Sequence, residues 1–321
     1  MPPAGVRAQP VLRMNTDMKT LAHAPSALAS LERPWLDGAL YPFTPRQHTA
    51  DEGTISYLDE GRGRPILFVH GTPSWSFEWR HQVAALSATH RCVAPDHLGF
   101  GLSDKPADAA YAPADHARRL LALVRALDLT DLTLVVHDFG GPIGLPILLE
   151  EPARVRALVL INTWAWAHGD DPSVRRLSRF VASPLGRFLY LSLNASPRWL
   201  VPMSFGDRKK LSRQVHRHYL APFGRRAERH APWALGCALA GADPYYATLW
   251  ERREALASVP STIVWGMRDP AFGSNYLARW RDALPHAELI ELAAAGHFPQ
   301  EEAPDEVTRA IREAATGCRA R

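Results

Sequence analysis

The chain has few cysteines, and none of them has the spacing that a cysteine-based site needs. Only Cys92, Cys237 and Cys318 occur in the 321 residues, and they are far apart, odd in number and outside any C-x-x-C pattern. A disulfide framework needs paired cysteines, and a structural zinc site needs closely spaced Cys or His ligands. The sequence therefore predicts reduced thiols and no metal site.

Long apolar runs and a marked excess of one charge are also missing. No stretch approaches the roughly 20 apolar residues of a membrane span, and residues 1–34 lack the apolar segment of a secretory signal. The net charge is +4, without the aromatic or glycine-rich signatures of nucleic-acid binding. We therefore expect a cytoplasmic location, no transmembrane segment and no nucleic-acid partner. Residues 1–40, with many Pro and Ala near the start, are expected to form a mobile or irregular extension.

From residue 41 onward, strand and helix patterns alternate along the chain. The apolar runs at residues 64–71, 132–138 and 155–163 have the length and β-branched content of buried strands. Between them lie helical patterns, of which residues 113–129 are the clearest amphipathic example. Such alternation predicts an α/β fold with a mostly parallel sheet that is covered by helices on both faces.

Residues 164–242 interrupt this alternation. They are helical and irregular in pattern and rich in Arg, Pro and aromatic residues, and strand and helix patterns resume after them. The interruption favours a helical insertion that returns to the same sheet. We therefore expect one α/β core, residues 41–163 and 243–321, with an inserted helical lid (cap) at residues 164–242.

The cap contains two strongly basic stretches, DRKKLSRQVHRHY (207–219) and GRRAERH (224–230). Charged runs of this kind are typical of solvated helix faces. Clustered positive charge also attracts anions, so an acidic substrate or a lipid surface is the alternative interpretation. The sequence does not decide between the two.

The segment VVHDFGG (135–141) places an aspartate at the corner between a strand and a helix. Gly140 and Gly141 allow strand and helix to approach closely, and the N–H groups of the following helix face any negative charge that develops at the turn. Asp138 thus takes the position of the nucleophile in a nucleophile elbow. A kinase DFG motif would need a phosphate loop and a catalytic loop that this sequence lacks, whereas a helix N-cap aspartate remains a competing interpretation.

Two further residues favour the nucleophile. Asp269 ends the apolar run TIVWGMRD, and His297 lies between the last strand and helix patterns. Each alone would be explained as a turn former or as one of 14 histidines. The chain order nucleophile, acid, histidine is that of α/β-hydrolases, with each residue after a strand. We therefore predict a catalytic triad of Asp138, Asp269 and His297.

At this point the chain resembles the haloalkane dehalogenase family of the α/β-hydrolase superfamily. The resemblance extends from about residue 40 to the last helix, and it implies the α/β-hydrolase fold. The late acid Asp269, with Asn162 rather than a carboxylate after the preceding strand, resembles the subgroup with an Asp-His-Asp triad. Six segments in order carry the resemblance: HGTPSWSFEWR (70–80), PDHLGFGLSDKP (95–106), VVHDFGGPIGL (135–145), NTWAW (162–166), WGMRDPAF (265–272) and GHFPQEEAPD (296–305).

The resemblance implies a mechanism that needs no cofactor, with a small apolar organic substrate and water as the reactants. Asp138 would attack the substrate carbon and form an alkyl ester with the enzyme. His297, oriented by Asp269, would then deprotonate the water that hydrolyses the ester. The backbone N–H groups of Phe139 and Thr72 are expected to form the oxyanion hole.

The sequence departs from this family at the residues that hold the departing halide. Dehalogenases of this type usually have a Trp directly after the nucleophile and often an Asn after the HG turn, where this chain has Phe139 and Thr72. Phe139 offers only its ring edge, and the Thr72 hydroxyl donates one hydrogen bond. Trp164 and Trp166, at the start of the cap, are candidates for the missing N–H donors, and packing of the cap against the core is the alternative role.

The missing donors keep other functions open. Close relatives of this subgroup resemble β-lactone decarboxylases of olefin biosynthesis, which use the same aspartate on a strained ring. An epoxide hydrolase would need tyrosines as ring-opening acids, and the candidates are Tyr190, Tyr219, Tyr245 and Tyr246. A scaffold that binds a ligand without turnover is a third class, and the sequence leaves the oligomeric state open.

Overall fold

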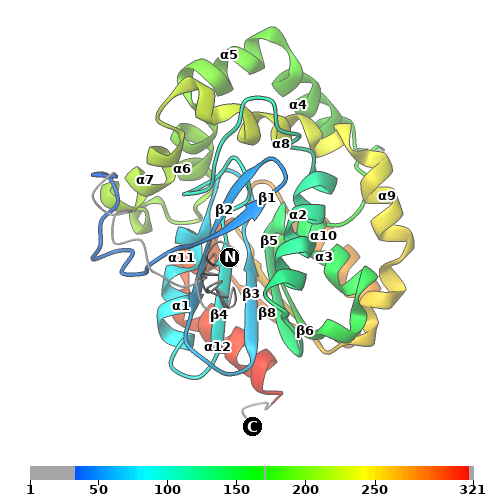
Figure 1. The fold of residues 1–321 in the computed structure, drawn as a ribbon. Coiled ribbons are helices and arrows are strands. Elements are labelled where there is room, and N and C mark those ends of the chain that lie inside the picture. Colours follow the sequence, from blue (N-terminus) through cyan, green and yellow to red (C-terminus); the bar gives the residue numbers. More distant parts are fainter. Residues whose placement is uncertain (1–32, 170, 318–321) are drawn as a thin grey trace, which may run out of the picture. The chain divides into compact units, whose positions relative to one another are not determined.

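The computed structural model describes residues 33–169 and 171–317 (Figure 1). Of the extension predicted at residues 1–40, residues 1–32 lie outside the described residues. Residues 35–40 form turns, and the Trp35 ring lies 5.9 Å from that of Trp75 and 6.3 Å from that of His218. Residues 35–40 thus have an irregular backbone, and the Trp35 side chain packs against Trp75 and His218.

One eight-stranded sheet runs through the core, with the strand order β1-β2-β4-β3-β5-β6-β7-β8. The pairs β1–β2 and β2–β4 are antiparallel, and every other neighbouring pair is parallel. The predicted mostly parallel sheet is thus confirmed. The strands are β1 (Arg46–Ala50), β2 (Gly53–Glu60), β3 (Pro65–Val69), β4 (Arg91–Pro95), β5 (Leu132–Asp138), β6 (Val155–Thr163), β7 (Ser261–Gly266) and β8 (Glu288–Leu292).

The central strands β3 to β7 are buried on both faces, and successive side chains of such a strand enter different cores. In β5, Leu134 and Val136 pack into the core that α2, α3 and α10 cover. Val135 between them faces the opposite core, which α1 and α12 cover. The two helical layers lie on either side of the sheet in Figure 1. Burial on both faces explains why the strand sequences are continuously apolar rather than alternating.

Helices connect the strands and fill both layers. The core helices are α1 (Arg80–Leu86), α2 (Pro113–Ala126), α3 (Gly140–Glu150), α10 (Ser274–Ala283), α11 (Pro299–Glu302) and α12 (Pro304–Thr316). Within residues 33–169 and 171–317, every helix is too short or too polar to cross a bilayer.

Between β6 and β7 the chain leaves the sheet and forms a series of helices above the carboxyl ends of the strands (Figure 1). The boundaries expected for the cap, residues 164 and 242, remain a prediction. In the structure, α9 begins at Asp243, directly after the expected end of the cap. The helices are α4 (Pro172–Ala182), α5 (Pro184–Leu193), the π-helix η3 (Ser196–Leu200), α6 (Val201–Ser204), α7 (Arg213–Leu220), α8 (His230–Gly241) and α9 (Asp243–Glu251).

Candidate active site

Asp138 lies at a strained turn between β5 and α3. Its φ is +51°, a left-handed backbone conformation that costs a non-glycine residue energy and often marks a functional position. The turn is tight, because a Cβ on Gly140 would lie 2.1 Å from the carbonyl oxygen of Val69. The sequence Asp-Phe-Gly-Gly therefore forms an elbow that presents the Asp138 side chain at the carboxyl end of the sheet.

The three residues of the predicted triad come together at this edge. The Nδ1 atom of His297 lies 2.8 Å from Oδ2 of Asp269, and its Nε2 atom lies 3.5 Å from Oδ2 of Asp138. All three side chains are buried. One imidazole thus spans two carboxylates, the geometry that nucleophile, base and orienting acid require.

The Asp269 carboxylate is held by donors on two sides. The amide of Asn162, at the end of β6, donates to Oδ2 over 2.8 Å, and the backbone N–H of Ala271 donates to Oδ1 over 2.7 Å. Burial by itself raises the pKa of Asp269, but the His297 charge and these two donors outweigh burial and hold the pKa below its ordinary value. Asp269 therefore remains a carboxylate that can orient His297.

Two carboxylates also determine the charge of His297. Burial alone would lower its pKa, but the charge of Asp269 and the contacts with Asp138 exceed that effect and raise the pKa to about 10. At neutral pH the imidazole is therefore protonated as long as both carboxylates are charged. Any reaction that removes the Asp138 charge removes part of the cause of this shift.

The loop that carries His297 is fixed by its neighbours. Its backbone N–H donates to the carbonyl of Ser204, at the end of α6, over 2.8 Å. Its carbonyl lies 2.7 Å from Nε2 of His137, the residue before the nucleophile. The Glu302 carboxylate accepts the N–H of Gly296 over 2.7 Å and that of Gly206 over 3.1 Å. Core and cap thus position the same histidine.

The segment after β3 contacts Asp138 from the other side. The backbone N–H of Thr72 donates to Oδ1 of Asp138 over 2.7 Å. Gly71 leaves room for this contact, because a Cβ there would lie 2.1 Å from the same oxygen. One carboxylate oxygen of Asp138 is therefore held by the backbone, and the other faces His297.

A cluster of aromatic side chains lies beside Asp138 and His297. The Trp164 ring is 4.7 Å from that of Phe139 and 5.1 Å from that of Phe272, and Phe272 is 5.4 Å from His297. In the part of the chain that the structure describes, neither the indole N–H of Trp164 nor the Thr72 hydroxyl has a hydrogen-bond partner, although both are buried. Such unpaired groups cost stability and call for an explanation.

Trp166 lies in a different environment. Its ring contacts Trp250 and Trp280, at 4.9 and 5.4 Å, and the Arg279 guanidinium lies 4.7 Å above it. These contacts join the start of the cap to α9 and α10. The structure therefore does not bring Trp166 together with Trp164, Thr72 and Phe139, and its contacts are those of a packing residue.

The four candidate tyrosines have different hydrogen-bond partners. The hydroxyl of Tyr219 donates to Glu301, that of Tyr245 to the carbonyl of Pro142 and that of Tyr246 to the carbonyl of Ala238. Burial raises the pKa of Tyr190, on α5, to about 12, with the Asp138 charge as a smaller cause and a hydrogen bond with Ser196 that lowers the pKa. The Asp138 charge also helps to raise the pKa of Tyr246, so this effect does not single out Tyr190.

Comparison with known proteins agrees with this geometry. Residues 64–304 match the family model described as alpha/beta hydrolase fold. The chain is 38% identical to haloalkane dehalogenase 2 of Mycobacterium tuberculosis over 279 residues, which cover 86% of this chain and 96% of the relative. The chain belongs to the haloalkane dehalogenase family of the α/β-hydrolase superfamily.

Further relatives and solved structures extend the similarity. The chain is 35% identical over 283 residues to a cis-3-alkyl-4-alkyloxetan-2-one decarboxylase of Shewanella oneidensis, with coverage of 85% of this chain and 88% of the relative. The crystal structure of haloalkane dehalogenase DbeA from Bradyrhizobium elkani superimposes with a TM-score of 0.78 at 27% identity, and covers 86% of this chain and 98% of that one. The predicted family and fold are thus confirmed, and the chain is a hydrolase of this family.

Several residues that position Asp269 and His297 were not identified from the sequence. Asn162 was noted only because it is not a carboxylate, yet its amide joins Asp269 to the end of β7 through a 2.8 Å bond from the Gly266 N–H. Ser204 and Glu302 were not singled out at all. His137, next to the nucleophile, carried the only local signal, because a polar residue at the end of a buried strand needs a partner.

Proposed function

We propose that this protein hydrolyses a carbon–halogen bond through a covalent ester on Asp138, and converts a haloalkane and water into an alcohol and a halide. The observation that supports the proposal most directly is the His297 imidazole between Asp138 and Asp269, at 3.5 and 2.8 Å. Asp138 is the nucleophile, His297 the base and Asp269 the acid that orients it. No cofactor enters the reaction.

In the first step Oδ2 of Asp138 attacks the carbon that bears the halogen. The carbon–halogen bond breaks as the carbon–oxygen bond forms, and the halide leaves with the bonding electrons and needs no proton. Oδ2 is the reactive oxygen because the Thr72 N–H holds Oδ1 at 2.7 Å. Oδ1 then becomes the carbonyl oxygen of the alkyl ester.

In the second step water attacks Cγ of that ester. The ester has no charge, so the pKa of His297 falls from its value beside two carboxylates. His297 releases its extra proton and accepts one from the attacking water. Charge then develops on Oδ1, where the N–H groups of Thr72 and Phe139 form the proposed oxyanion hole. As this intermediate collapses, the bond between Cγ and Oδ2 breaks, and the departing oxygen takes the proton that His297 holds and leaves as the alcohol. The carboxylic acid that forms from the water oxygen then gives its proton to His297, which restores the Asp138 carboxylate and the imidazolium.

The departing halide needs donors in a site from which water is excluded. We propose the Trp164 indole and the Thr72 hydroxyl for this role, because both are buried without a partner in the described chain. Trp164 lies against the Phe139 ring, the residue that follows the nucleophile.

A second candidate function is the decarboxylation of a β-lactone to an alkene and carbon dioxide. It is favoured by the 35% identity to the oxetanone decarboxylases of Shewanella oneidensis and Xanthomonas campestris. Epoxide hydrolysis has less support, because three of the four candidate tyrosines donate their hydroxyl proton to other groups, and the hydroxyl of the fourth, Tyr190, forms a hydrogen bond with Ser196. A scaffold without turnover would not need the three-residue contact at His297.

The variant His297→Ala tests the proposal. After incubation with a bromoalkane, mass spectrometry is expected to find one alkyl group on the peptide that contains Asp138, because the ester forms but water is not activated. The double variant Asp138→Ala, His297→Ala is the control and should remain unmodified. Wild type should release bromide. Conversion of a cis-β-lactone to an alkene, without bromide release, would select the second candidate instead.

We also propose a cytoplasmic location. The thiols of Cys92 and Cys237 are free in the structure, as a reducing compartment would keep them. Fractionation of cells that express the chain, with a periplasmic marker as the control, tests this location.

A further inference from the structure

The cap exposes a group of large apolar side chains to solvent. Of the eight large hydrophobic side chains that the described residues expose, seven lie between residues 177 and 203. Leu177 and Phe180 on α4 and Leu185 and Phe188 on α5 are 44–58% exposed. These four side chains are called the cap patch below. Single exposed apolar residues are ordinary, but a group of this kind marks an interaction surface.

The fold of α4 and α5 determines which side chains form the cap patch. On α4, Ser178 and Val181 face inward, and the Ser178 hydroxyl donates to the carbonyl of Cys237 on α8 over 2.8 Å. Leu177 and Phe180 therefore point outward. A sharp turn at Ser183 joins the two helices, and a Cβ on Gly186 would lie 2.1 Å from the carbonyl of Phe180. The turn keeps the exposed faces of both helices on the outside of the cap.

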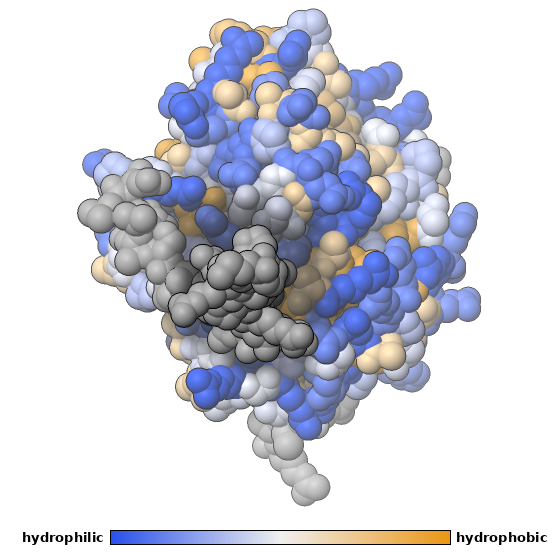
Figure 2. Space-filling view, in the orientation of Figure 1, coloured by the Kyte–Doolittle hydropathy of each residue, from blue (hydrophilic) through white to orange (hydrophobic). Residues whose placement is uncertain are grey.

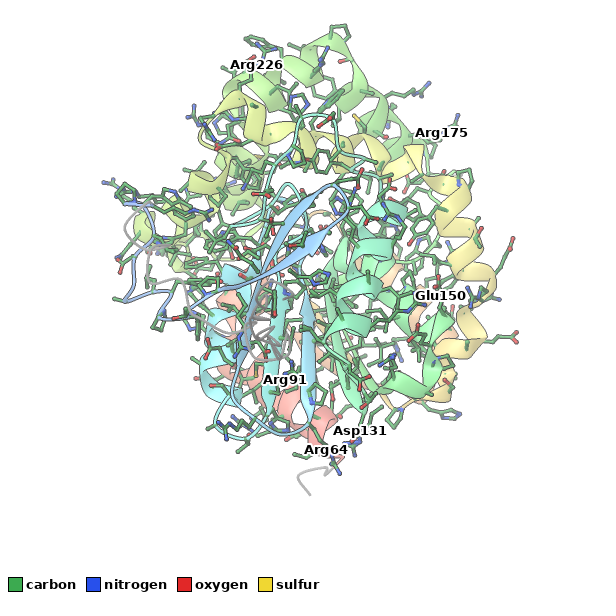
Figure 3. All side chains as sticks on the ribbon, in the orientation of Figure 1. Arg64, Arg91, Asp131, Glu150, Arg175 and Arg226 are labelled. Carbon is green, nitrogen blue, oxygen red and sulfur yellow. The ribbon has the colours of Figure 1, made fainter. Side chains whose placement is uncertain are left out.

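Positive charge surrounds the cap patch. Residues 172–206 contain five arginines and no Asp or Glu. Among the described residues no carboxylate forms a salt bridge with any of the five. Orange side chains lie among blue ones in Figure 2 where α4 and α5 lie in Figure 1, and Arg175 projects at the periphery of the cap in Figure 3. The arginines are Arg175, Arg176, Arg179, Arg187 and Arg198.

We propose that the cap patch binds the surface of an anionic lipid bilayer. Short helices with apolar and cationic side chains on their exposed faces insert the apolar groups at the headgroup boundary while arginines bind the lipid phosphates. A second copy of the chain would fit this surface poorly, because a symmetric contact would bring the same arginines together. The positive charge, which has no carboxylate partner among the described residues, instead matches a partner that is negatively charged and apolar beneath its surface.

Leu185 and Phe188 on α5 are exposed on the cap, and the cap lies above the carboxyl ends of the strands, where Asp138 ends β5 (Figure 1). An apolar substrate dissolved in the bilayer would then meet the cap directly. This last consequence rests on the proposed function, but the lipid contact itself does not.

Vesicle flotation of the full chain without substrate tests the proposal. Vesicles of phosphatidylcholine with phosphatidylglycerol are expected to carry the protein to the top of the gradient, and phosphatidylcholine alone far less. High salt should weaken the binding, since each arginine near an anionic surface contributes roughly fivefold to the affinity.

Two matched variants separate the cap patch from net charge. Phe180→Asp with Phe188→Asp is expected to reduce binding by roughly a hundredfold, because each aromatic side chain contributes roughly tenfold on insertion. Arg62→Glu with Arg309→Glu changes the net charge by twice as much as the Phe variant does, at two exposed residues outside the cap. This control variant should retain most of the binding. Circular dichroism and thermal melting confirm that both variants fold.

Three results would overturn the proposal. The first is that wild type does not float with anionic vesicles, and the second is that the Phe180, Phe188 variant floats as well as wild type. The third is that light scattering finds a dimer of wild type and a monomer of this variant, while wild type does not bind vesicles. The last result would identify a second copy as the occupant. Loss of hydrolytic activity alone would bear only on the proposed function, because flotation is measured without substrate.

Discussion

Replacement of Trp164 by Phe distinguishes a hydrogen-bond donor from a packing residue. The indole is fully buried and its N–H has no acceptor among the described residues. Loss of one donor to developing charge in a dry site costs about 2.7–4 kcal/mol, or roughly 10²–10³ in kcat. Loss of ring volume costs about 1–2 kcal/mol of stability, by comparison with other partial truncations. Removal of an unpaired buried N–H returns about 1–3 kcal/mol. The free energy of unfolding should therefore change little while halide release falls steeply.

Trp75→Phe is the matched control. Trp75 is equally buried, but its indole donates to the carbonyl of His218 over 2.9 Å. The same truncation there leaves a buried carbonyl unpaired, so it should cost about 2–5 kcal/mol of stability and leave halide release nearly unchanged. Urea denaturation gives the stability of both variants, and a halide assay with a bromoalkane gives kcat and KM.

One outcome would contradict the reasoning directly. If Trp164→Phe loses as much stability as Trp75→Phe and retains halide release, the indole only packs the cap against the core. The unpaired N–H would then need another explanation. A fall in kcat with unchanged stability supports the donor role, because packing alone does not produce that combination.

Three further predictions follow from the contacts of the site. Gly71→Ala should leave a folded protein that loses about 10²-fold or more in kcat, because the new methyl displaces the Asp138 carboxylate; circular dichroism and kinetics check both parts, and a fully active variant would refute the close contact. The pKa of His297 is raised from 6.5 to about 10, so the free energy of unfolding of wild type should fall relative to that of His297→Ala as pH rises through this range, by at most about 1.4 kcal/mol per pH unit. Thermal melts of both proteins at pH 7 and 9 measure the difference in stability. A difference that is the same at both pH values would contradict the raised pKa. Asn162→Ala should reduce kcat by a larger factor than it increases KM, because Asp269 loses one of its hydrogen-bond donors. A variant with the kcat of wild type would show that the Ala271 N–H alone is sufficient to hold the Asp269 carboxylate.

The fold and the triad could be predicted because their determinants are local in sequence. The strand before Asp138 is buried on both faces, so it is continuously apolar, and the elbow needs glycines at fixed positions after it. Asp269 and His297 each follow a strand, and parallel strands bring their carboxyl ends to one edge of the sheet. Chain order and strand ends were therefore sufficient to assemble three residues that are far apart in sequence.

The surroundings of the triad depend on packing that the sequence pattern does not encode. Trp164 and Trp166 are two residues apart, yet one contacts Phe139 beside the nucleophile and the other contacts Trp250 under the cap. Adjacent candidates of the same residue type could not be separated without the position of α9 and α10. The same holds for the four tyrosines, because a hydroxyl group is identified by its partner rather than by its neighbours in sequence.

The charges of the site determine the order of the proposed steps. In the free protein His297 is a cation between Asp138 and Asp269, since both contacts raise its pKa, and the cation offsets the repulsion between two buried carboxylates. It cannot act as a base in this state, so water is not activated before substrate binds. Ester formation neutralises Asp138 and releases the proton of His297, which becomes a base only when there is an ester to hydrolyse. In a rapid-mix experiment, ester formation should therefore persist at pH values where ester hydrolysis has already slowed, and the pKa of the second step should lie below that of His297 in the free protein.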